Sequence, residues 1–220
     1  MVTHGLKKNQ IMLHDKQIYP LVGLGTYTLK SEKEISAALR AALDSGYRLF
    51  DTAVMYGNEK QLGAVLKKMQ IQRSEILVTS KILPEDMTYD RTLKSVQNTL
   101  KNLQTEYIDM MLLHWPGAAS AEKRRESYRA LEECYEKGYL RGIGVSNFLP
   151  RHIESLQYKI KPLLNQIEIH PLYVESSTIE WCAQQQIVVE AYSPLAVGDA
   201  QLLKKPLVQN LAAKYKKSAS

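Results

Sequence analysis

The sequence has little cysteine and no long uninterrupted apolar run. Its two cysteines, Cys134 and Cys182, are too few for a disulfide framework and lack the spacing of metal ligands, so we expect a reducing compartment and no bound metal. No apolar stretch approaches the roughly 18 residues of a membrane-spanning helix. The start, Met1–Gln10, lacks the apolar centre of a secretion signal. These absences predict a cytoplasmic protein without a membrane partner.

Glycine- or serine-rich linkers and low-complexity segments are also missing. The 220 residues are 45% hydrophobic and 24% charged, as in ordinary globular proteins, and we expect one domain over residues 1–220. The net charge of +6 does not indicate nucleic-acid binding, because acidic residues are interspersed with the basic ones. The densest basic stretch is Lys204–Lys217. It carries Leu207, Leu211 and Tyr215 at helical spacing, and we interpret it as a solvated amphipathic helix.

The sequence does contain a regular alternation of short apolar runs with longer stretches of helical periodicity. Runs such as Ile76–Val78 and Met110–Leu113 are apolar on both faces, which is typical of buried parallel strands. The runs expected to form strands are Leu21–Gly25, Arg48–Asp51, Glu75–Ser80, Tyr107–His114, Gly142–Ser146, Leu163–Ile169 and Ile187–Ala191. Repeated βα units of this kind predict an α/β fold, a TIM-type (β/α)8 barrel.

Signals between these runs define helix ends and a hairpin. Ser31 and Glu34 form a capping-box pattern, and Gly46 is suited to end the same helix. Gln10–Leu13 and Gln17–Tyr19 flank a polar turn and predict an N-terminal β-hairpin. A complete barrel usually needs about 250 residues. After the hairpin there is room for about seven βα units, so we expect an incomplete barrel with the eighth strand missing.

Polar residues follow several predicted strands at the carboxyl ends, where barrel enzymes carry their catalytic groups. Asp51, Lys81 and His114 each end an apolar run, and Tyr56 lies in the loop after Asp51. A lysine cation lowers the pKa of a nearby tyrosine, so we expect Tyr56 to protonate a substrate oxygen. Asp51 would orient Lys81, and His114 would align a carbonyl. Each residue alone has an ordinary structural interpretation, but together they suit carbonyl reduction by hydride.

The residues around this predicted site resemble the aldo-keto reductase family. Gly46–Glu59 resembles the first signature of that family. Four further blocks follow in the order of the family: Leu113–Pro116, Gly142–Phe148, Asn165–Pro171 and Ala191–Leu195. Five blocks in order cover nearly the whole chain and are far more specific than a single motif.

The resemblance implies a role for each matching residue. The catalytic tetrad would be Asp51, Tyr56, Lys81 and His114, in agreement with the reasoning from the residues. The residues implied to bind the cofactor NADPH are Thr26, Asp51, Ser146, Asn147, Gln166, Tyr192, Ser193 and Leu195. Among them, Ser146, Asn147 and Gln166 would hydrogen-bond the nicotinamide carboxamide, and Tyr192 would stack on the ring. The implied substrate-binding residues are Tyr27, Tyr56, His114 and Trp115.

The resemblance therefore implies a monomeric NADPH-dependent enzyme of the alcohol dehydrogenase (NADP+) or aldose reductase type, which reduces aldehydes or ketones with Tyr56 as proton donor. The short segment from Pro116 to Glu122 indicates a shallow pocket and favours small aldehydes, dicarbonyls or sugar-derived aldehydes. Family members hold the 2′-phosphate with residues beyond the position matching Ser220, so we expect weakened NADPH affinity, and the choice between NADPH and NADH stays open. Two alternatives are a non-catalytic or regulatory relative and an inactive truncated product.

Overall fold

A computed structural model describes residues 9–219, so most of the segment Met1–Gln10, for which we expect no secretion signal, lies outside the described residues. Each predicted apolar run overlaps one strand. The strands are β3 (Leu24–Gly25), β4 (Leu49–Asp51), β5 (Leu77–Ile82), β6 (Met110–Leu113), β7 (Ile143–Ser146), β8 (Leu164–Glu168) and β9 (Val188–Tyr192). Two of them, β5 and β9, end beyond their runs, at Ile82 and Tyr192. The other five strands are shorter than their runs, because apolar composition does not report where ladder hydrogen bonds begin and end.

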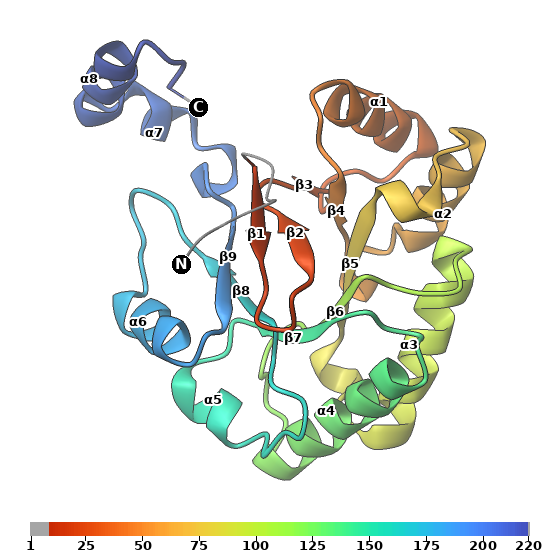
Figure 1. Ribbon diagram of the computed structural model, residues 1–220. Helices are drawn as coiled ribbons and strands as arrows, with labels where there is room; N and C mark the ends of the chain where they lie inside the picture. Colours follow the sequence, from red (N-terminus) through yellow and green to blue (C-terminus); the bar gives the residue numbers. More distant parts are fainter. Residues whose placement is uncertain (1–8, 220) are drawn as a thin grey trace.

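These seven strands form one parallel sheet in chain order, with β3 and β9 at its edges within the described residues. The sheet curves around a common axis and helices cover its outer face (Figure 1). The predicted α/β barrel with about seven βα units is therefore confirmed.

Successive residues of each strand alternate between the interior of the barrel and the covering helices. Leu49, Met110 and Leu112 pack together in an inner cluster, whereas Phe50 and Met111 belong to the layer beneath the helices. All five side chains are buried. This two-sided burial explains why the strands are apolar on both faces.

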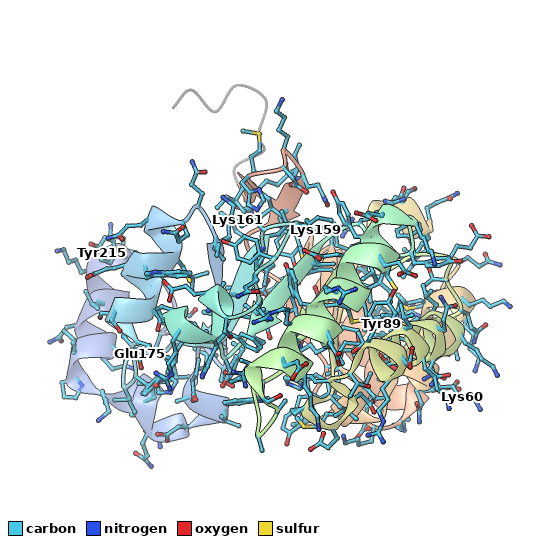
Figure 2. The ribbon with its side chains drawn as sticks, turned by 90° about the horizontal axis from the view of Figure 1, so that it is seen from below. Lys60, Tyr89, Lys159, Lys161, Glu175 and Tyr215 are labelled. Carbon is cyan, nitrogen blue, oxygen red and sulfur yellow. The ribbon has the colours of Figure 1, made fainter. Side chains whose placement is uncertain are left out.

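The predicted hairpin forms from β1 (Gln10–Met12) and β2 (Ile18–Pro20), which pair antiparallel. Its buried Tyr19 joins the inner cluster, and the Tyr19 hydroxyl lies 3.0 Å from Oγ1 of Thr79. Figure 2 shows the hairpin at the same end of the barrel as Lys161, which precedes β8, whereas Glu175, which follows β8, lies farther from it. The hairpin therefore closes the amino-terminal end of the barrel, and the strands point their carboxyl ends away from it.

The helices around the barrel begin and end largely where the sequence signals indicate. They are α1 (Glu32–Asp44), α2 (Glu59–Lys68), α3 (Tyr89–Leu103), α4 (Ala121–Glu136), α5 (Pro150–Glu154) and α6 (Ser176–Gln184). At the start of α1 the Ser31 hydroxyl accepts from the backbone N–H of Glu34, and the Glu34 carboxylate accepts from that of Ser31. Gly46 follows α1 with a φ of 86°. The predicted capping box and glycine ending are both confirmed.

Two further helices, α7 (Ala200–Lys204) and α8 (Pro206–Tyr215), follow β9. The predicted amphipathic helix is α8, and Leu207, Leu211 and Tyr215 along it are all exposed. In Figure 1 both helices lie outside the ring of α1–α6. No helix among the described residues combines the length and the apolar character needed to cross a membrane.

Candidate active site

The four residues of the predicted tetrad meet at the carboxyl-terminal end of the barrel. Asp51 ends β4, Lys81 lies in β5 and His114 directly follows β6. Tyr56 ends the short 3-10 helix η1 (Val54–Tyr56), and Gly57 ends that turn with a φ of 66°. Neighbouring parallel strands thus bring together side chains that are up to 63 positions apart in the sequence.

A buried asparagine fixes the loop that carries Tyr56. The side-chain amide of Asn58 donates to the backbone oxygens of Thr26 and Leu29, at 2.8 Å each. Its Oδ1 accepts from the hydroxyl of Thr52 at 2.7 Å. These bonds join the segments after β3 and β4, so the loop that presents Tyr56 is held from both sides.

The ammonium group of Lys81 lies at the centre of the tetrad. The residue is 0% exposed, and its Nζ donates to Oδ1 of Asp51 at 2.5 Å and to the backbone oxygen of Thr52 at 3.0 Å. Nζ also lies 3.4 Å from the hydroxyl oxygen of Tyr56. A buried cation needs such partners, because leaving it without them carries a large desolvation cost. Asp51 therefore holds Lys81 against the Tyr56 hydroxyl.

The Tyr56 hydroxyl accepts a hydrogen bond from Lys81, so its own proton is free to be donated. Burial and the negative charge of Asp51 raise the pKa of Tyr56 above its ordinary value. The expectation of a lowered Tyr56 pKa is thus wrong for this structure, because desolvation and the carboxylate of Asp51 set the direction of the shift. Tyr56 consequently keeps its proton at neutral pH, as a proton donor must.

His114 lies beside Tyr56, with the two ring centroids 5.9 Å apart and the rings nearly perpendicular. Burial and the charge of Lys81 lower the pKa of His114 to about 4. Its Nδ1 atom is buried and has no hydrogen-bond partner among the described residues. At neutral pH the site therefore presents an uncharged imidazole with unused hydrogen-bonding capacity.

We expect the ring resonances of His114 to stay constant in NMR spectra between pH 8 and about pH 5.5, because its folded pKa of about 4 lies below the unfolded value of about 6.5. Its contribution to stability is fully present above about pH 6.5 and is lost as the pH falls towards 4. Between pH 6.5 and pH 4 the free energy of unfolding of the wild type should therefore fall by about 2–3 kcal/mol more than that of His114→Asn. A titration midpoint of His114 at or above pH 6.5 would contradict this assignment.

Three of the predicted cofactor-binding residues form a hydrogen-bonded row beside the tetrad. The hydroxyl of Tyr192 donates to Oδ1 of Asn147 at 3.0 Å, and Nδ2 of Asn147 donates to Oγ of Ser146 at 3.0 Å. The same Nδ2 also donates to the backbone oxygen of His114 at 3.0 Å. The row therefore places an aromatic ring, an amide and a hydroxyl next to His114.

Gln166 lies at the inner end of this row and also contacts the tetrad. Its Nε2 donates to Oδ2 of Asp51 at 2.8 Å and to Oε1 of Glu190 at 2.6 Å. Glu190 is not among the site residues predicted from the sequence. It is the acidic residue inside the otherwise apolar run Ile187–Ala191, and that signal, together with the period of two along a strand, was available to find it.

The remaining predicted residues are more peripheral. Thr26 is fully buried, and its Oγ1 donates to the backbone oxygen of Asp51 at 2.9 Å. Tyr27 and Trp115 are exposed, and the Tyr27 ring lies 5.0 Å from that of Tyr56. Ser193 and Leu195 lie in the turn after β9, beyond the tetrad. Tyr27 and Trp115 thus lie at the open end of the barrel, whereas Thr26 is buried in its wall.

Comparisons with known proteins agree with one another. The family model described as "Aldo/keto reductase family" matches residues 21–217. Glyoxal reductase of Bacillus subtilis is 38% identical over 97% of this chain and 76% of the relative. Methylglyoxal reductase DkgA of Escherichia coli K12 is 35% identical over 94% of this chain and 75% of the relative. The crystal structure of an aldo/keto reductase from Brucella melitensis superposes with a TM-score of 0.87 and 36% identity, covering 96% of this chain and 80% of that one.

Proposed function

This chain belongs to the aldo/keto reductase family, whose members act on small carbonyl compounds and generally use a nicotinamide cofactor, and from that premise we propose that it reduces aldehydes to alcohols with NADPH. The observation that carries the proposal is the buried contact of Lys81 with both Asp51 and Tyr56. This contact leaves a neutral phenol, oriented by a cation, at the open end of the barrel.

The residues beside the tetrad fit a nicotinamide ring. Ser146 and Asn147 supply the hydroxyl and amide groups that a carboxamide requires, and Tyr192 supplies a planar aromatic surface next to them. The unpartnered Nδ1 of His114 shows that hydrogen-bonding capacity remains in the same place. A bound nicotinamide would supply the hydride for the reduction.

The residues of the chain would then handle the proton and the carbonyl oxygen. The neutral imidazole of His114 would donate a hydrogen bond to that oxygen and align it. Tyr56 would transfer its hydroxyl proton to the oxygen as negative charge develops there, which leaves a phenolate on Tyr56. The Lys81 ammonium, 3.4 Å away, would stabilise this phenolate until a proton from solvent restores the phenol.

For the substrate we propose small aldehydes and dicarbonyls. Two relatives carry the names glyoxal reductase and methylglyoxal reductase. In this chain only a short segment separates His114 from α4, which begins at Ala121. Tyr27 and Trp115 are exposed at the open end and offer aromatic surface to a small carbonyl compound.

The full chain is expected to oxidise NADPH when methylglyoxal is added and to form one alcohol per NADPH consumed. Tyr192→Ala should raise the KM for NADPH more than it lowers kcat, because it removes ring contact and leaves the tetrad in place. The measurement is the loss of NADPH absorbance, with the product identified separately. A regulatory relative would bind NADPH, as seen by quenching of tryptophan fluorescence, and consume none with any aldehyde tested, which would refute the proposal.

A further inference from the structure

A second carboxylate lies inside the barrel beside the tetrad. Glu190 lies in β9 directly opposite Gln166 in the register of β8 and β9. Its Oε1 accepts from Nε2 of Gln166 at 2.6 Å, and the same nitrogen donates to Oδ2 of Asp51 at 2.8 Å. The other oxygen of Glu190, Oε2, is buried without a hydrogen-bond partner among the described residues. One amide group therefore connects two carboxylates.

The charges that face Glu190 from every side are unbalanced. Asp51 faces it from β4, Lys81 from β5 and Tyr19 from the hairpin, in addition to the neutral Gln166 of β8. Lys81 is the one cation in this group, and its Nζ lies 2.5 Å from Asp51. Ionised Glu190 would consequently leave one negative charge in the interior without a counter-ion.

We propose that Glu190 is a positioning residue for carbonyl reduction: through Gln166 its protonation state sets the charge around Asp51 and Lys81, and the protonated form is the one that favours proton transfer from Tyr56. The inference rests on the proposed function. A proton taken from solvent neutralises Glu190, so that Asp51 and Lys81 balance each other. Loss of that proton adds a negative charge facing Asp51 and Lys81, and Lys81 is the cation that must stabilise the Tyr56 phenolate.

The environment of Glu190 places this change within the working pH range. Burial, followed by the charge of Asp51, raises the pKa of Glu190 to about 7, and interactions with Gln166, Lys81 and Tyr19 act in the opposite direction. Above that pH the added charge disfavours the Tyr56 phenolate, so reduction slows. We expect the kcat for reduction by the wild type to fall roughly three- to tenfold between pH 6 and pH 8, which corresponds to up to about one pKa unit at Tyr56.

Glu190→Gln separates this effect from a structural one, because glutamine keeps the shape and the acceptor oxygen but does not ionise. We expect its kcat to change less than about twofold between pH 6 and pH 8, with little change in the KM for NADPH. The matched control is Glu180→Gln on the outer face of α6, which should keep the wild-type profile. Parallel pH profiles for the wild type and Glu190→Gln would overturn the inference.

Thermal unfolding gives a readout that does not depend on activity. The folded pKa of about 7 lies above the unfolded value of about 4.3, so the stabilising effect of the proton on Glu190 is fully present below about pH 4.3 and is lost as the pH rises through 7. The Tm of Glu190→Gln minus that of the wild type should therefore increase by roughly 3–8 °C between pH 5 and pH 8. If the difference in Tm between Glu190→Gln and the wild type does not change with pH, the inference about Glu190 is overturned and the proposed function is unaffected. The expected Tm pattern in a protein without turnover overturns the proposed function and, with it, the role of Glu190 in reduction.

Discussion

Replacing Tyr56 with phenylalanine is expected to lower kcat for aldehyde reduction by about 10²- to 10⁴-fold, the usual contribution of a positioned general acid. The change removes one hydroxyl group, which lies 3.4 Å from Nζ of Lys81. The aromatic ring remains, with its contacts to Tyr27 and His114. The KM for NADPH should stay nearly constant, because Tyr56 is not among the residues predicted to bind the cofactor. Steady-state rates at pH 7 provide the measurement.

Tyr139→Phe is the matched control for Tyr56→Phe. It removes the same hydroxyl group from a tyrosine that precedes β7, at the opposite end of that strand from Ser146. We expect its kcat to stay within about twofold of the wild-type value, since no reacting group is lost. Retention of most of the activity in Tyr56→Phe would mean that another group donates the proton.

Replacing Lys81 with methionine is expected to damage both stability and activity. The side chains of Lys81 and Asp51 are 1% and 14% exposed, so removal of the cation leaves a carboxylate buried without its counter-ion. The loss of stability should be about 3–5 kcal/mol, measured as a lower midpoint of urea unfolding. Reduction should fall at least about 10²-fold, because Tyr56 loses the cation that stabilises its phenolate.

Two variants distinguish a buried ion pair from an ordinary one. Lys68→Met breaks the exposed pair with Glu32, and it should cost only about 0–1 kcal/mol. Adding Asp51→Asn to Lys81→Met should recover part of the lost stability without restoring activity, since the uncompensated charge is gone but the tetrad is not rebuilt. Equal stability losses in Lys68→Met and Lys81→Met would show that burial of the pair has no energetic effect.

Much of the fold follows from periodicity in the sequence. Strands such as β6 are apolar on both faces because one face lies against the helices and the other inside the barrel. The capping box at Ser31 and Glu34 is a local pattern that needs no tertiary information. The rule that functional groups lie at strand carboxyl ends then places Asp51, Lys81 and His114 on one edge of the barrel. These features follow from patterns among residues that are close in the sequence, so they can be predicted from the sequence directly.

Other features depend on burial and register, which periodicity does not report. The sequence predicts that Lys81 lies close to Tyr56. It does not predict that the pKa of Tyr56 is raised, because that shift comes from desolvation and from the charge of Asp51. The link from Glu190 through Gln166 to Asp51 requires the pairing of β8 with β9 and the curvature of the sheet, which brings β8 opposite β4. Such long-range contacts are fixed by packing between elements.

The transfer of isotope from cofactor to product tests the account most directly. NADPH that carries two deuterium atoms at C4 of the nicotinamide would be mixed with the full chain and methylglyoxal, and the alcohol would be analysed by mass spectrometry and NMR. We expect one deuterium at the carbinol carbon of each product molecule, delivered from one of the two C4 positions, together with a hydroxyl proton from solvent exchange. Product without deuterium at that carbon, or no product from a folded protein, would contradict a hydride-transferring site built on Asp51, Tyr56, Lys81 and His114.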